Sequence, residues 1–216
     1  TSLRAQLLFL LREPPVSVDF RDWTTERAAP GGSLPTLFIP AENRLIATED
    51  IRVWLEATYP IKGKSKEHNG MPDQVTSDRA LAVAQLVLGR LLPAYLASQP
   101  KPPADLYRYF PVPPPLLIGL ATPIPLSLTG EGRGLDREDI IRQGIETFEA
   151  FETLLDGSDW AMGVPHPTPL DALIASHLYV IYALPDSSVL RHSLSEREAL
   201  GRYVEQVLGF AEARKA

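Results

Sequence analysis

The chain has 216 residues, a formal net charge of −6 from 21 Lys and Arg against 27 Asp and Glu, and 44% hydrophobic residues. This composition is enough for a substantial core, and the acidic balance excludes a protein that binds nucleic acid mainly by neutralising phosphates. The absence of cysteine excludes a disulfide scaffold, a thiolate zinc site and a cysteine nucleophile, and the four scattered histidines show no metal-ligand spacing.

The first sixty residues alternate between helical and extended patterns. Residues 2–12 carry leucines at helical spacing and predict a helix, which two following prolines end. Residues 16–21 alternate apolar and polar side chains, which predicts a strand. Residues 34–39 and 44–47 predict a hairpin, and residues 48–59 predict a helix capped by its first residue, a threonine.

The remainder of the chain predicts helices. We expect them at 73–98 (bent at Pro93), 135–156, 168–184 and 194–213. The sequence therefore predicts an α/β domain over 1–60, a basic linker over 61–72 and a helical domain over 73–216.

Membrane spanning is not expected from the apolar segments. We find no stretch of about 18 to 20 apolar residues free of helix breakers, so we expect a soluble or peripheral protein. The first helical pattern begins at once, without the strand that would normally precede it, and we expect further residues before Thr1.

Two motifs carry a family resemblance. Residues 33–37 (SLPTL), followed by 45–55 (LIATEDIRVWL), resemble the N-terminal domain of glutathione transferases, where a proline precedes the third strand. Residues 168–171 (TPLD) resemble the capping box that opens the buried sixth helix of that fold, in which Thr168 and Asp171 exchange bonds with backbone amides. The resemblance implies a thioredoxin-like domain, lacking its first strand, followed by a transferase-type helical domain.

The resemblance also marks the positions that hold glutathione. Pro35 either shapes the start of its strand or follows a cis peptide bond that exposes a backbone edge to a thiol ligand. Ala47 stands where the family has an acidic residue, and Thr48 where it has serine. Ser2 is either a helix cap or the remaining candidate catalyst. These departures predict vestigial ligand positions, no catalytic residue and no cofactor.

Among relatives of this fold without the chemistry, the chain resembles the metaxin family. The residues that carry this likeness are 35–37, 48–55, the proline-containing helix at 91–95 and 168–172, and the helix is most similar to the second metaxin. The resemblance implies a peripheral subunit on the cytosolic face of the mitochondrial outer membrane, within the sorting and assembly machinery for β-barrels. Implied partners are the barrel assembly protein, a second metaxin-like subunit and precursor barrels, without nucleic acid. The alternatives are a thiol-conjugating glutathione transferase and a cytosolic scaffold.

A proline-rich apolar insertion over 100–130 does not fit a plain transferase. Nine of the 21 prolines lie between 100 and 125, and residues 110–129 carry no charge. The prolines within this run prevent a membrane helix. The run either packs on the protein's own surface or contacts a partner or the bilayer. The candidate contact residues are Phe110, Val112, Leu116, Leu117 and Ile118.

No metal site is predicted. His177 lies in an otherwise apolar helix and is expected to be a hydrogen-bonded core residue. Glu146, Glu149 and Glu152 share one helix and are expected to form a solvated face, because no His or Asp is spaced to join them.

Overall fold

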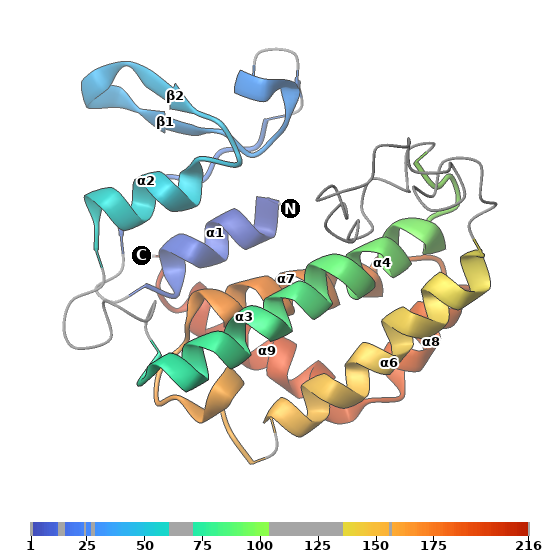
Figure 1. Ribbon diagram of the computed structural model, residues 1–216. Coiled ribbons are helices and arrows are strands. Elements are labelled where there is room, and N and C mark those ends of the chain that lie inside the picture. Colours follow the sequence, from blue (N-terminus) through green and yellow to red (C-terminus); the bar gives the residue numbers. More distant parts are fainter. Residues whose placement is uncertain are drawn as a thin grey trace, which may run out of the picture.

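The computed structural model describes residues 2–12, 16–23, 25–26, 29–60, 71–103, 136–155 and 157–215. A small α/β unit sits on one side of a larger helical bundle (Figure 1). The α/β unit contains α1 (Ser2–Leu10), β1 (Leu37–Ile39), β2 (Arg44–Ile46) and α2 (Ile51–Thr58). The bundle contains α3 (Gln74–Leu86), α4 (Leu92–Ser98), α6 (Arg137–Leu155), α7 (Pro169–Tyr182), α8 (Val189–Ser195) and α9 (Glu198–Glu212).

The predicted hairpin is confirmed. β1 and β2 pair antiparallel, with Leu37 opposite Ile46. A small core forms beneath the hairpin, where the helices α1 and α2 pack on it; its buried members are Phe9, Ile46, Ile51 and Leu55. The two helices thus bury one face of the two-stranded sheet that the hairpin forms.

The prediction of a strand over 16–21 is wrong for this structure. The side chains do alternate, since Val16, Val18 and Phe20 are half-buried while Ser17 and Asp19 are exposed. The described residues nevertheless offer this segment no neighbouring strand, because β1 is paired to β2 alone. A strand needs a partner for its backbone amides and carbonyls, so the alternation alone does not produce one.

The long helix predicted over 73–98 is continuous, but a π-helical turn divides it into α3 and α4. Asp73 caps α3 by accepting a hydrogen bond from the amide of Thr76 at 2.7 Å. A π-helical turn, Val87–Leu91, joins α3 to α4, and Pro93 lies immediately after it. Proline lacks an amide and clashes with the carbonyl four residues earlier, so the wider turn accommodates it without breaking the helix.

Length and composition give this continuous helix a further property. Among the described residues, the stretch Gln74–Ser98 is the one helix long and apolar enough to cross a membrane by those two criteria, which the sequence analysis did not anticipate. The same stretch contacts α6 and α7 of the bundle. Core helices of soluble proteins pass the same test, so this property is weak support for membrane insertion.

Helix α7 is the centre of the bundle and is buried along almost its whole length. Helices α1, α3, α8 and α9 all contact it. The helix predicted over 194–213 corresponds to α9 and was predicted to begin four residues too early, since it runs across Arg197, whose backbone is not helical (φ −104°, ψ 82°), into the last two residues of α8. Neither glycine nor proline marks this break, which is why the sequence pattern reads as one helix.

Two arginines connect the bundle to the α/β unit. Arg214, after α9, donates to the carbonyls of Leu10 (3.5 Å) and Arg12 (3.2 Å) at the end of α1. Arg12 in turn donates from Nε to the carbonyl of Tyr59 (2.7 Å) at the end of α2. Cationic side chains at helix C-termini satisfy carbonyls that have no intrahelical partner. Arg214 and Arg12 thus provide donors for the C-terminal ends of α1 and α2, respectively.

Candidate functional site

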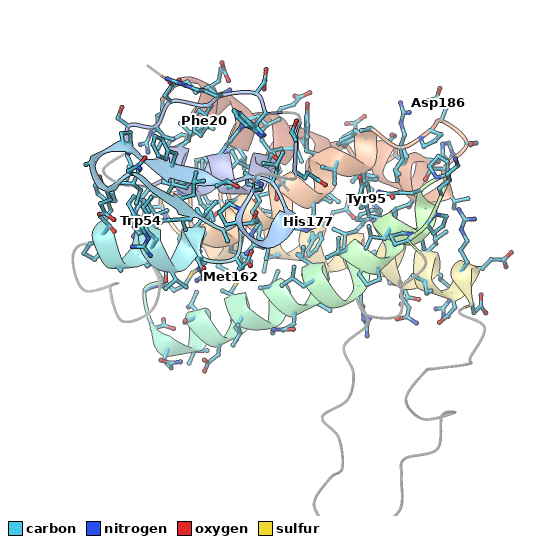
Figure 2. All side chains as sticks on the ribbon, turned by 90° about the horizontal axis from the view of Figure 1, so that it is seen from above. Phe20, Trp54, Tyr95, Met162, His177 and Asp186 are labelled. Carbon is cyan, nitrogen blue, oxygen red and sulfur yellow. The ribbon has the colours of Figure 1, made fainter. Side chains whose placement is uncertain are left out.

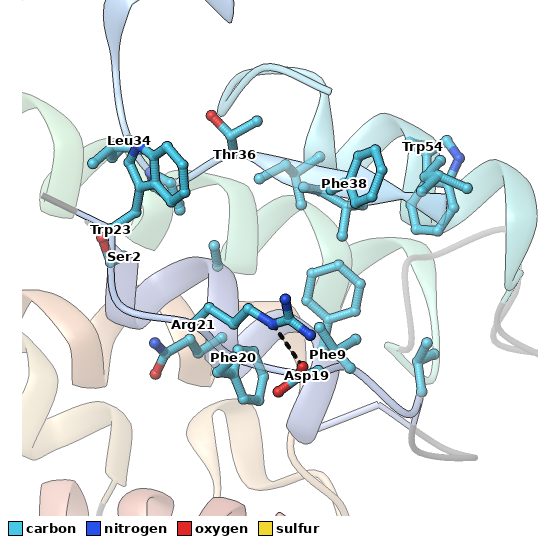
Figure 3. Close-up of a pocket in the computed structure, with 18 of the residues that line it drawn as sticks. Ser2, Phe9, Asp19, Phe20, Arg21, Trp23, Leu34, Thr36, Phe38 and Trp54 are labelled. Carbon is cyan, nitrogen blue, oxygen red and sulfur yellow. Dashed lines mark hydrogen bonds and ion pairs between the residues drawn. The ribbon is translucent and has the colours of Figure 1, made fainter. Parts of the chain in front are cut away.

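A cavity of about 660 Å³ opens in the α/β unit, beside the predicted ligand position Pro35. One wall is the extended segment 16–23, and the opposite wall is the segment 34–40, which includes β1. The helix α1 contributes lining residues Ser2, Ala5, Gln6 and Phe9, and α2 contributes Ile51 and Trp54. Figure 3 shows Trp23, Leu34 and Ser2 grouped at one end, with Phe38 and Trp54 toward the other.

The Leu34–Pro35 peptide bond is cis. The hydroxyl of Thr48 donates to the Pro35 carbonyl at 2.5 Å, and the Ser33 carbonyl lies 3.4 Å from the same oxygen. The predicted capping role of Thr48 is wrong, because α2 begins at Ile51, three residues later; the Thr48 hydroxyl instead ties the loop before β1 to the end of the hairpin. The position N-terminal to α2 is Asp50, whose side chain forms no capping bond.

The vestigial ligand positions do not converge on the cavity. Ala47 and Thr48 are half-buried but do not contribute to its lining, whereas Pro35 does. Ala47 has no polar side-chain atom, and the Thr48 hydroxyl already donates its proton to the Pro35 carbonyl. Ser2 is the first residue of α1 and its exposed side chain lines the cavity. A bound glutathione would thus find neither the acidic residue nor the free hydroxyl that the transferase resemblance implies.

We predict that the protein does not bind glutathione at micromolar concentration and does not conjugate a standard electrophile. The physical reason is the loss of two hydrogen-bonding partners at Ala47 and Thr48, each worth about 0.5 to 1.5 kcal/mol or more when it bonds a charged group. Isothermal titration calorimetry measures this directly, with a catalytically active transferase as the positive control. A micromolar dissociation constant would contradict the prediction.

The capping box of α7 belongs to a larger buried network. Asp171 is fully buried and accepts hydrogen bonds from the Thr168 amide (2.7 Å), the Thr168 hydroxyl (2.8 Å) and the Ala161 amide (2.8 Å). The hydroxyl of Tyr203 on α9 donates a fourth bond, also at 2.8 Å. Burial raises the pKa of the Asp171 carboxyl, and the four hydrogen bonds oppose that shift. The network joins the start of α7 to the loop before it and to α9.

Ala161 and Tyr203 were not predicted from the sequence. Ten and 32 residues separate them from Asp171, so no local motif links them. The only available signal is that Tyr203 falls on the buried face of an amphipathic helix, where a phenol hydroxyl needs a partner. Because burial and the neighbouring carboxylate raise the pKa of Tyr203 well above its ordinary value, this hydroxyl remains a donor.

His177 is a core residue, as expected. It lies in the interior of the molecule (Figure 2), 4% exposed, and its Nδ1 is 2.8 Å from the Leu173 carbonyl one helical turn earlier. Burial lowers the pKa of His177 from 6.5 to about 4, although the bond to Leu173 opposes the shift. The imidazole is therefore neutral at pH 7 and donates from Nδ1 to the carbonyl.

We predict that this histidine makes the fold sensitive to mild acid. The folded state binds a proton at His177 less readily than the unfolded chain, so its contribution is complete above pH 6.5 and is lost as the pH falls towards about 4. The pKa difference sets an upper limit of roughly 3 kcal/mol. Urea denaturation across this range should show a flatter pH profile for His177→Gln than for the unchanged protein. Parallel losses in the two proteins would assign the acid sensitivity to other groups.

Several predicted features lie outside the described residues. These are the candidate contact residues Phe110, Val112, Leu116, Leu117 and Ile118, and most of the predicted linker over 61–72. Within the described part of the chain, no group of three or more His, Asp or Glu side chains is placed to hold a metal ion.

Comparison with known proteins yields two likenesses. Residues 144–207, from the middle of α6 into α9, match the family model of the glutathione S-transferase C-terminal domain. The chain is also 37% identical over 83 residues to the mitochondrial outer membrane import complex protein METAXIN of Arabidopsis thaliana. That match covers 38% of this chain and 26% of the relative, so the chain spans about a quarter of the relative's length in the matched region. Together the two matches support a metaxin-like protein with a glutathione S-transferase-type fold.

Proposed function

We propose that the protein is a non-enzymatic adaptor of the β-barrel sorting and assembly machinery in the mitochondrial outer membrane. It docks on the barrel assembly protein from the cytosolic side, beside a second metaxin-like subunit, and assists precursor recognition, insertion or release. The likeness to a plant import-complex metaxin supports the location and the process. The single structural observation in favour of a non-enzymatic role is the Thr48–Pro35 hydrogen bond next to Ala47, which leaves the ligand position without partners.

The proposal includes the architecture that the family resemblance implies. The α/β unit corresponds to a thioredoxin-like domain over 1–60, represented by α1, the hairpin and α2, and the helical domain extends over 73–216. In this arrangement the two arginines that join α1, α2 and α9 fix the first domain to the second. An adaptor with two rigidly joined domains presents partners with one continuous surface.

Purification from the organism's own mitochondria tests the proposal. The tagged full-length protein, solubilised in mild detergent, should co-purify with a membrane β-barrel and with a second metaxin-like subunit at defined stoichiometry. Protease added to intact mitochondria should degrade it, and alkaline carbonate should extract it, because the proposal places it peripherally on the cytosolic face. Recovery as a lone soluble dimer, or protection from protease, would contradict the adaptor role.

The apolar run 110–129 supplies the proposed contact with the partner or the bilayer surface. We predict that Leu116→Asp with Leu117→Asp lowers recovery of the membrane complex severalfold while leaving the melting temperature of the isolated protein within a few degrees, because a charge buried in an apolar contact is costly. Ser127→Asp in the same run is the matched control. A double mutant that melts early yet still assembles would show that the run packs on its own domain.

A glutathione transferase remains the second candidate function. The cavity beside Pro35, which Ser2 helps to line, favours it. Calorimetry with glutathione separates it from the adaptor.

A further inference from the structure

The continuous helix formed by α3 and α4 is more apolar than its burial in the bundle explains. Gln74–Ser98 is long and apolar enough to cross a membrane, yet 33% of its most apolar 18 residues are buried in the protein. Helix α7, the central helix of the bundle, is by contrast buried along almost its whole length. A helix that is apolar well beyond its buried stripe has apolar surface left to cover, so packing in the bundle accounts for only part of this composition.

The uncovered surface lies on one side of α3. Five exposed residues of this helix recur three, four and seven positions apart, which places them on the same side; they are Val75, Asp78, Leu81, Ala82 and Gln85. Val75 and Leu81 are each 62% exposed. Figures 1 and 2 both show α3 at the outside of the bundle, with α7 behind it. We call these five residues the outer side of α3.

Two arginines give this surface a charge that an anionic lipid complements. Arg79 and Arg90 are exposed on the same continuous helix, about three turns apart. Neither forms an ion pair with another residue in the part of the chain that the structure describes. An arginine stem lies along apolar surface while its guanidinium reaches outward, and a guanidinium pairs well with phosphate. Apolar side chains bordered by unpaired guanidinium groups match the boundary between lipid headgroups and acyl chains.

The extent of the outer side favours a bilayer over a second protein molecule. A stable protein interface takes about 20 to 30 residues from each partner. Helix α3 has 13 residues in all, and only one side of it is exposed. A helix that lies on a bilayer needs no more than its own exposed side, because the lipids adapt to its shape.

Asp78 is the acidic residue on the outer side, and it limits the strength of such a contact. Gln74 donates a hydrogen bond to its carboxylate at 2.7 Å, one turn earlier in the helix. A carboxylate beside anionic headgroups is repelled, whereas each cationic residue there is attracted. We therefore expect weak, reversible association that depends on both the apolar and the cationic residues.

We propose that the outer side of α3 rests on a bilayer surface that contains anionic lipids. Val75 and Leu81 enter the boundary between headgroups and acyl chains, and Arg79 and Arg90 bind lipid phosphates. The helix lies in the plane of the membrane and keeps its contact with α7, so it does not span the bilayer. This inference rests on the peripheral membrane location in the proposed function and names the surface that makes the contact.

Flotation with vesicles of phosphatidylcholine and a minority of phosphatidylserine tests the proposal on the full chain. We expect Leu81→Asp to lower the affinity for vesicles at least about tenfold, because a charge replaces an apolar contact. Val53→Asp is the matched control, since this valine is 66% exposed on α2, and it should keep the affinity within about twofold. Circular dichroism checks that both variants are folded. Equal affinities of the two variants would overturn the proposal.

Asp78→Asn provides a gain of binding that misfolding does not mimic. It removes the repelled carboxylate and should raise the affinity about threefold to fivefold, an effect that disappears on vesicles of phosphatidylcholine alone. Unchanged affinity of this variant on the anionic vesicles would contradict the proposal. Binding that requires Leu116 and Leu117 but not Leu81 would overturn it as well.

Two further observations separate this inference from its alternatives. Light scattering that shows a dimer dissociated by Leu81→Asp, without vesicle binding, would mean that a second copy covers the outer side and would overturn the proposal. The vesicles contain no import machinery, so failure to co-purify a β-barrel contradicts the adaptor role without affecting flotation. Failure of flotation, in turn, leaves the protein contacts of the adaptor intact.

Discussion

Asp171→Ala is expected to lower the free energy of unfolding by about 4 kcal/mol, which is more than the 0.5 to 2 kcal/mol of an ordinary helix cap. Removal of the carboxylate leaves the amides of Ala161 and Thr168 and the hydroxyl of Tyr203 without an acceptor in a buried site. Each unsatisfied buried group costs about 1 to 3 kcal/mol, and partial relaxation or water entry reduces the sum. Urea denaturation monitored by circular dichroism measures the loss.

Single-bond variants provide the controls for this prediction. Thr168→Ala and Tyr203→Phe each remove one donor and leave the carboxylate with its other partners, so each should cost about 0.5 to 2 kcal/mol. Thr168 and Asp171 bond each other directly, and the double mutant should therefore cost less than the sum of the two single mutants. Additive losses, or an Asp171→Ala effect no larger than that of Thr168→Ala, would contradict the network.

Gly144→Ala is expected to destabilise the protein by about 3 kcal/mol, at the upper end of the range for an overpacked core. A Cβ atom at residue 144 of α6 would lie 2.2 Å from the Cβ of Ala94 on α4 and 3.7 Å from the Ala94 Cα. No rotamer relieves this contact, because a Cβ position is fixed by the backbone. The helices α4 and α6 must separate, and they form an extensive interface in the bundle. Thermal and urea denaturation would both report the loss.

Two variants distinguish helix contact from an effect of the glycine itself. Gly209→Ala on α9 meets nothing within 4 Å, so it should be neutral or stabilise by up to about 1 kcal/mol through helix propensity. Ala94→Gly combined with Gly144→Ala removes the opposing Cβ and should restore much of the lost stability. Failure of Ala94→Gly to rescue Gly144→Ala would exclude the close approach as the cause.

The sequence predicted elements well where local chemistry decides them. The α7 capping box depends on residues three apart, and the hairpin depends on two apolar runs around a short turn, so both can be recognised locally. The segment 16–21 shows the limit: its alternation is real, yet strand formation depends on a partner that the pattern does not contain. The boundary between α8 and α9 was missed because it has no proline or glycine.

The candidate site was less predictable, because its decisive contacts are distant in sequence. Thr48 reads as a helix cap from its neighbours, but its hydroxyl bonds Pro35, thirteen residues earlier. The cavity residue Trp23 carries no motif and was not predicted. Asp171 was found as a cap, while its role as a shared acceptor for α9 required the three-dimensional structure.

The π-helical turn at Val87–Leu91 holds one more residue than an α-helical turn, so it shifts the residue register of the continuous helix formed by α3 and α4 by one position. Each residue beyond this turn therefore lies about 100° around the helix axis from the position it would have in an uninterrupted α-helix of 3.6 residues per turn. The residues of α4 that contact α6 are thus not those that the spacing of α3, continued without the π-helical turn, would place on that side. Deleting one residue within this turn would restore an ordinary α-helical turn and leave the faces of α3 and α4 in place, whereas deleting one residue from the regular part of α3 would turn the preceding residues by about 100° about the helix axis. The exposed face of α3, which carries Val75 and Leu81, is therefore set by this single turn.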